Sequence, residues 1–109
     1  MSSLYAQYTK EKHGFDCFET EIGFITYREV DDVAWGRDFF IIASERGTGK
    51  ARELWNGLKE KLVSEGMTKF ILSIGTRTED AERLVPMYLK WGAKVKDALD
   101  GFIILEVEL

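Results

Sequence analysis

The sequence predicts a single domain with an α/β (α+β) fold. We expect a mixed, mostly antiparallel sheet with a central parallel strand pair and helices on both faces. Three observations lead to this prediction. Aromatic and β-branched stretches crowd residues 15–43 and indicate an antiparallel meander. A strand, an amphipathic helix and a nearly all-apolar strand follow, as in a parallel crossover. The chain ends in two short strands joined at Leu99-Asp100-Gly101.

The first elements are a short helix and three strands. Residues 3–11 carry apolar side chains at helical spacing, and His13-Gly14 ends this helix. Residues 15–19, 22–30 and 33–43 have the composition of strands. Because short turns separate them, we expect neighbouring strands to pair in antiparallel fashion.

The next helix is the most regular element of the chain. Apolar residues recur every three or four positions from Gly49 to Glu65, as expected for a helix that lies on a sheet. Gly66 follows as a left-handed cap, and the apolar run 69–74 is typical of a strand covered on both faces.

A third helix and a hairpin complete the prediction. Thr76-x-x-Glu79 has the pattern of a capping box, and apolar side chains then line one side of a helix that ends at Gly92. Pro86 should kink this helix or split it in two, because proline lacks the amide donor and collides with the preceding turn. Residues 93–98 and 102–109 form the hairpin.

Composition limits the function. The 109 residues suffice for one domain, 1–109, and the net charge of −4 argues against nucleic-acid binding, since Lys and Arg supply most of that affinity. No stretch has membrane-spanning length and the N-terminus lacks a signal-peptide pattern, so we expect no membrane partner and a cytoplasmic protein. A single histidine, His13, and a single cysteine, Cys17, predict no metal site.

The run Arg46-Gly47-Thr48-Gly49-Lys50-Ala51 joins a predicted strand to a predicted helix. Unpaired backbone N–H groups at a helix N-terminus can hold a phosphate, so this run predicts an anion site. Neither of two common phosphate loops fits. The P-loop needs a glycine where Ser44 stands and a hydroxyl where Ala51 stands, and the dinucleotide fingerprint needs a third glycine where Arg52 stands.

A third pattern does fit. Arg/Gln-x-x-Gly-x-Gly/Ala, present as Arg46, Gly49 and Ala51, resembles the pyrophosphate loop of the GNAT superfamily of N-acetyltransferases. Tyr88 and Gly92 are similar to the Tyr-x-x-x-Gly pattern that ends that family's last helix, although Ala93 stands where the family usually has Phe. The order of the predicted elements agrees with the family, and the short N-terminal part resembles reduced members from prokaryotes and their phages.

The resemblance implies acetyl-CoA as co-substrate, no metal, and a set of binding residues. Backbone amides of the loop would hold the pyrophosphate, with added charge from Arg46 or Lys50, while the backbone at the end of the preceding strand would hold the pantetheine arm. An amide near Ile41 would stabilise the oxyanion. The alternatives are an ordinary strand-to-helix turn and plain core packing. The implied cofactor-binding residues are Ile41, Ile42, Ala43, Arg46, Gly47, Thr48, Gly49, Lys50 and Ala51.

Tyr88 stands at the position of the family tyrosine that protonates the departing thiolate, and is the implied catalytic residue. On the residues alone, an amphipathic core tyrosine is an equal alternative. Asp38, Glu45 and Glu29 lie on or beside the central strands as candidate bases, and the sequence does not choose among them.

The resemblance implies an N-acetyltransferase that moves an acetyl group from acetyl-CoA to a primary amine by direct attack. The acceptor would be a protein lysine or N-terminus, or a small amine. About twenty residues precede Ile22, so we expect an open acceptor side that suits a protein acceptor or a pocket completed in a homodimer. The alternatives are a non-catalytic module of the same fold that binds a protein, and an enzyme that uses another acyl-CoA.

Overall fold

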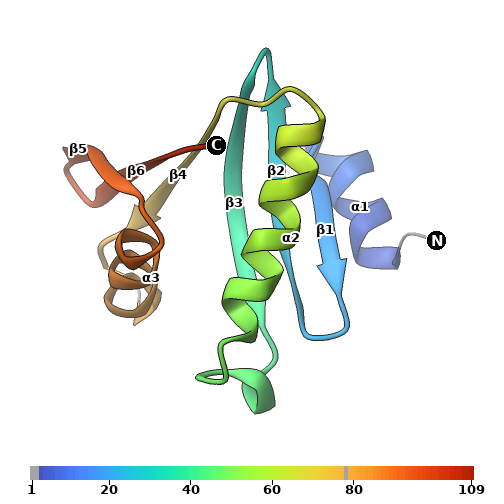
Figure 1. Cartoon of the computed structure of the whole chain (residues 1–109), viewed down its shortest axis with the longest axis horizontal. Helices are drawn as coiled ribbons and strands as arrows, with labels where there is room; N and C mark the ends of the chain where they lie inside the picture. Colours follow the sequence, from blue (N-terminus) through green and yellow to red (C-terminus); the bar gives the residue numbers. More distant parts are fainter. Residues whose placement is uncertain (1–2, 78) are drawn as a thin grey trace.

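The computed structural model describes residues 3–77 and 79–109, which form a mixed sheet and three α-helices (Figure 1). The predicted elements are present, with ends that shift by a few residues. In chain order they are α1 (Leu4–His13), β1 (Asp16–Thr20), β2 (Gly23–Val30), β3 (Val33–Ile41), the 3-10 turn η1 (Ala43–Glu45), α2 (Lys50–Ser64), β4 (Lys69–Gly75), α3 (Glu79–Lys90), β5 (Lys94–Leu99) and β6 (Phe102–Glu108).

The strand order of the sheet is β1-β2-β3-β4-β6-β5. Strands β3 and β4 pair in parallel, and all other neighbours in this sheet are antiparallel. The predicted fold class and the predicted meander are therefore confirmed. The third strand ends at Ile41 rather than at residue 43, because the chain turns into η1.

The helices cover opposite faces of the sheet. On the α1 face, the ring of Tyr5 lies 4.7 Å from that of Phe24, which stacks on Phe40 at 5.5 Å. On the other face, Trp55 of α2 packs edge-on against Phe70 of β4 at 4.9 Å. Successive side chains of a strand point to opposite faces, so each strand contributes to both layers. None of the described helices is long and apolar enough to cross a membrane.

The helix ends follow from local chemistry. The Ser3 hydroxyl accepts a bond from the Ala6 amide at 3.0 Å, and Gly14 ends α1 with a φ of 72°. Gly66 follows α2 with a φ of 85°, as predicted. The predicted capping box at Thr76-x-x-Glu79 lies partly outside the described residues.

Pro86 does not split the third helix, and that alternative was wrong. Helix α3 runs from Glu79 to Lys90 with Pro86 inside it. A proline removes only one hydrogen bond of the helical ladder, and the turns on either side retain theirs.

The parallel ladder between β3 and β4 is short. In the described part of the chain it begins at Val33–Lys69 and ends at Gly36–Leu72, whereas β3 continues to Ile41. The ring of Phe70 lies against Gly36, so close that a Cβ on Gly36 would overlap it. Beyond this contact the two strands part, and Figure 1 shows β4 leading toward α3 and away from the lower half of β3.

We expect Gly36→Ala to destabilise the protein by roughly 1–3 kcal/mol, because the added methyl group must displace the buried ring of Phe70. Urea unfolding of the purified variant measures this loss. In the background of Phe70→Leu, the cost of Gly36→Ala should be smaller, since the clashing ring atoms are gone. Equal costs in both backgrounds would contradict the packing explanation.

Candidate functional site

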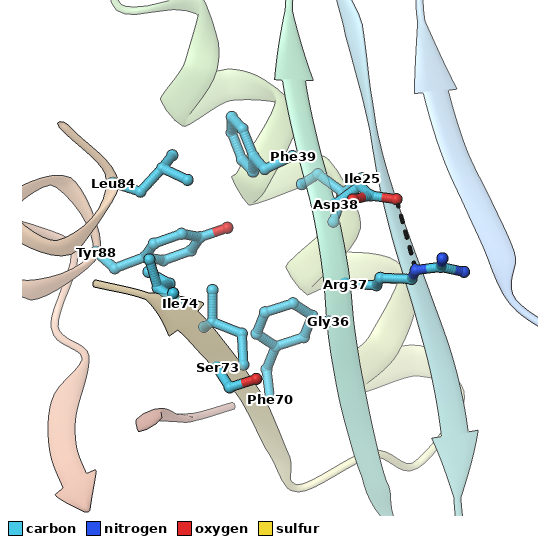
Figure 2. A pocket seen from close by; sticks show the side chains of 12 residues that line it. Ile25, Gly36, Arg37, Asp38, Phe39, Phe70, Ser73, Ile74, Leu84 and Tyr88 are labelled. Carbon is cyan, nitrogen blue, oxygen red and sulfur yellow. Dashed lines mark ion pairs between the residues drawn. The ribbon is translucent and has the colours of Figure 1, made fainter. Parts of the chain in front are cut away.

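A cavity of about 140 Å³ lies where β3 and β4 part. It reaches both faces of the sheet. Tyr88 and Leu84 of α3 line it on one face, while Ser73 points to the other face by strand alternation. A bulge in β3, where Arg37 and Asp38 both lie opposite Thr26, places Asp38 on that second face as well. Figure 2 shows the Tyr88 hydroxyl directed toward β3 across the gap, with Arg37 and Asp38 beyond that strand.

The backbone of β3 supplies hydrogen-bond donors to this gap. The amides of Asp38 and Ile42 both bond toward β2, to the Thr26 hydroxyl at 2.9 Å and to the Ile22 carbonyl at 2.8 Å. Because amides alternate along a strand, those of Phe39 and Ile41 face β4. The parallel ladder has already ended there, so these two amides face the opening.

A second cavity of about 190 Å³ continues the first toward the loop before α2. Phe39 and Leu84 line both cavities, which makes them neighbours along one channel. The walls of the second cavity are mostly apolar, and they include three of the predicted binding residues of the loop. The complete lining is Phe39, Ile41, Arg46, Gly47, Ala51, Arg83, Leu84 and Met87.

The loop has the geometry of an anion site. Gly47 and Gly49 adopt φ angles of 78° and 85°, and nothing lies within 4 Å of where their Cβ atoms would stand. Only glycine adopts such angles readily, so the loop presents bare backbone to open space. Gly49 caps α2 without a side-chain hydrogen bond to the first turn, and the helix dipole makes this end positive.

The charged side chains of the loop bond within the chain. Arg46 Nε donates to the Ile41 carbonyl at 2.9 Å, which ties the loop to the end of β3. Lys50 Nζ lies 3.2 Å from Glu45, and the Thr48 hydroxyl donates to the Glu45 carbonyl at 2.7 Å. Of the loop cations Arg46 and Lys50, Arg46 is the one that lines the second cavity.

The structure distinguishes among the predicted strand residues. Ile41 lines the second cavity. Ile42 uses its amide on Ile22, so that amide cannot hold a ligand without breaking an internal bond, and its carbonyl accepts from Glu45 at 3.0 Å. Ala43 begins η1, and its carbonyl accepts from the Arg46 amide at 3.3 Å.

Tyr88 is held by an aromatic cluster. Its ring lies edge-on to those of Phe39, Trp55 and Trp91, at 5.9, 6.0 and 5.6 Å between ring centres. The side chain is 1% exposed, and burial raises the pKa of its phenol well above the ordinary value. The hydroxyl therefore keeps its proton at neutral pH and is available as a hydrogen-bond donor.

Of the three candidate carboxylates, Asp38 lines the cavity at the parting of the strands. Its oxygen accepts from the Thr26 hydroxyl at 3.3 Å and lies 3.9 Å from Arg37 Nε. Glu45 is paired with Lys50 at the loop. Glu29 lies at the far end of β2, where burial and Glu65 raise its carboxyl pKa.

The sequence did not identify several lining residues, among them Phe39, Ser73, Leu84 and Met87. For the helix, a signal existed. Leu84, Met87 and Tyr88 have i, i+3, i+4 spacing, which places all three on one face once Tyr88 is assigned to the site. For Ser73 the sequence carries no such signal, because this residue lines the cavity only as a result of where the parallel ladder ends.

The chain belongs to the acetyltransferase (GNAT) family, whose model matches residues 3–93. A search of curated proteins gives no match. The family resemblance noted from the loop and from Tyr88 is thus confirmed over most of the chain.

Solved structures with this fold include three acetyltransferases at low sequence identity. PaiA N-acetyltransferase of Thermoplasma acidophilum, solved with coenzyme A, has a TM-score of 0.70 and 18% identity over 81% of this chain and 54% of that one. The ribosomal-protein-S18-alanine N-acetyltransferase of Escherichia coli has a TM-score of 0.71 and 16% identity over 98% and 77%. A GNAT family acetyltransferase of Elizabethkingia anophelis with acetyl-CoA bound has a TM-score of 0.67 and 16% identity over 81% and 69%. The chain thus spans about half the length of the Thermoplasma protein.

The raised pKa of Tyr88 predicts an alkaline loss of stability. The unfolded chain ionises this phenol near its ordinary pKa of 10.0, whereas the folded protein keeps it neutral. Its contribution is present below pH 10 and is lost as the pH rises further. Above about pH 10, the free energy of unfolding should fall more steeply in the wild type than in Tyr88→Phe, by up to about 1.4 kcal/mol per pH unit. Urea unfolding from about pH 8 to about pH 11 measures both slopes, and equal slopes would contradict the burial of this hydroxyl.

Proposed function

We propose that this protein is an N-acetyltransferase that moves an acetyl group from acetyl-CoA to a primary amine by direct attack. The observation that carries the proposal is the channel formed by the two cavities. It runs from a glycine loop at a helix N-terminus, past two inward-facing amides, to a buried tyrosine. Membership of the acetyltransferase (GNAT) family supports the same reaction.

The described residues fit coenzyme A. The open backbone of Gly47 and Gly49 suits a pyrophosphate, and so does the start of α2, whose first amides have no side-chain hydrogen bond from the cap. A pyrophosphate needs several N–H donors and a positive field. The mostly apolar second cavity suits a slender pantetheine arm. Thr48, Lys50 and Ala51 would contribute chiefly through their backbone amides, since the first two side chains bond to Glu45.

The chemistry requires two proton transfers around one bond exchange. The neutral amine nitrogen attacks the thioester carbonyl carbon, a C–N bond forms, and the C–S bond breaks with its electron pair leaving on sulfur. The amides of Phe39 and Ile41 stabilise the negative charge that develops on the carbonyl oxygen. Tyr88 donates its proton to the departing sulfur and regains one from solvent, so the products are the acetamide and the free thiol.

Asp38 is our assignment for the group that receives the proton of the attacking amine. It lines the cavity on the face opposite to Tyr88, so an amine between them has a proton acceptor on one side and the proton donor for sulfur on the other. The rival function is a non-catalytic module that binds a protein. Homodimer formation and the cytoplasmic location stay predictions.

We expect purified protein to bind acetyl-CoA with micromolar affinity in calorimetry and Gly49→Val to abolish that binding. A valine there strains the positive φ and fills the space where the pyrophosphate would lie. Absence of binding to the wild type would favour the non-catalytic module.

Gly66→Val is the matched control. Gly66 has the same φ of 85° and the same open surroundings, but it lies at the other end of α2. Both variants therefore carry similar backbone strain. If both lose acetyl-CoA binding equally, general destabilisation is the cause and the loop assignment is wrong.

Tyr88→Phe and Asp38→Asn should each lower kcat by about 10²-fold or more while the affinity for acetyl-CoA is retained, because each removes a proton-transfer group and keeps the shape of the side chain. Steady-state kinetics with an amine that the wild type acetylates measure kcat, and a calorimetric titration measures the affinity for acetyl-CoA. An unchanged kcat in either variant would remove that residue from the mechanism.

A further inference from the structure

Two arginines gather beside the cavity on the α1 face of a chain whose net charge is −4. The guanidinium carbons of Arg28 and Arg37 lie 4.9 and 5.0 Å from the centre of one ring, that of Phe15. Arg28 belongs to β2 and Arg37 to β3, so the strand pairing brings them together. Positive charge is therefore concentrated next to the reaction site, where the overall composition does not suggest it.

The position of this arginine pair is fixed by the end of α1. Gly14 turns the chain, and the Phe15 amide bonds back to the Thr9 carbonyl at 3.2 Å, which holds the ring over the strands. One Arg28 nitrogen donates to the His13 carbonyl at 2.9 Å. Each guanidinium lies against an aromatic face, which limits its motion without consuming its hydrogen-bond donors.

Arg37 also lines the first cavity, next to Asp38. The two side chains form only a loose ion pair, with 3.9 Å between Arg37 Nε and the nearer Asp38 oxygen. Both are about half exposed, at 44% and 50%. Asp38 and Arg37 therefore offer one negative and one positive group at the cavity, and Arg28 lies on the same Phe15 ring as Arg37.

We propose that the acceptor is a small amine that also carries an anionic group, either a carboxylate or a phosphate. The amine enters the cavity beside Asp38, and the anionic group binds Arg37 with support from Arg28. This inference rests on the proposed acetyltransferase function and narrows its acceptor class. Guanidinium groups favour this ligand because their paired N–H donors match the oxygens of carboxylate and phosphate.

The size of the cavity agrees with this assignment. Its volume of about 140 Å³ is well below the ≈ 300–1,000 Å³ of typical pockets for drug-sized ligands. Only a slender amine end fits inside, so the rest of the acceptor stays at the mouth. The half-exposed guanidinium of Arg37 lies outside this gap, beyond β3 (Figure 2).

Matched pairs of amines test the proposal. The pairs are lysine with cadaverine, β-alanine with propylamine, and phosphoethanolamine with ethanolamine, and each differs in one anionic group. We expect kcat/KM with acetyl-CoA to be at least about tenfold higher for the anionic member of a pair, the gain of one charge-assisted hydrogen bond. The first two pairs report on carboxylate and the third on phosphate.

The arginine variants connect the preference to this site. Arg37→Gln should reduce the ratio of kcat/KM between the members with and without the anionic group by about tenfold, and Arg28→Gln by less. Arg37→Lys should restore part of the ratio, because it keeps the charge and loses the planar pair of donors. Lys59→Gln removes a positive charge from α2, lines neither cavity, and should leave the ratio unchanged.

The outcomes separate this inference from the function on which it rests. No acetyl-CoA binding and no transfer to any amine would overturn the proposed function itself. Transfer without a preference for anionic amines, transfer to peptides alone, or a preference that survives Arg37→Gln would overturn only the acceptor assignment. Calorimetric titration of Arg37→Gln with acetyl-CoA checks that the cofactor side is intact in the variant.

Discussion

The parting of β3 and β4 is the constraint on which the site depends. Parallel strands normally satisfy each other's backbone groups along their whole length, and a buried amide without a partner is costly. Here the ladder ends at Gly36–Leu72, where the ring of Phe70 packs onto a glycine that has no side chain to keep it away. The amides of Phe39 and Ile41 are thereby left facing a cavity, and we propose that they bind the acyl carbonyl there.

The packing of α2 and α3 keeps this opening from collapsing. Trp55 stacks on Trp91 with 6.4 Å between ring centres and meets Phe70 and Tyr88 edge-on, so one side chain of α2 contacts both walls of the gap. Large rings have few rotamers, and a close-packed cluster of them resists rearrangement. The same contacts aim the Tyr88 hydroxyl, which makes its orientation a property of the core rather than of a mobile loop.

The two faces of the sheet have different electrostatic character near the gap. On the side of α2, the positive end of a helix and bare glycine backbone suit a diphosphate. On the side of α1, Asp38 lies next to Arg37, and Arg28 shares the ring of Phe15 with it. In the proposed reaction, the two substrates therefore approach from opposite faces and do not compete for the same charges.

The sequence by itself determined the elements, the fold class, the glycine loop and the position of Tyr88. Each of these depends on local chemistry: the period of apolar residues, the backbone freedom of glycine, and a motif that spans a few positions. The sequence also named three candidate bases, Asp38, Glu45 and Glu29, but offered no basis for choosing one of them. The tertiary structure showed which of the three lines the cavity, namely Asp38, and decided the use of the Ile42 amide within the sheet and the pairing of Arg28 with Arg37 across two strands. These depend on where a parallel ladder ends and on which strands become neighbours, and contacts between residues distant in sequence fix both.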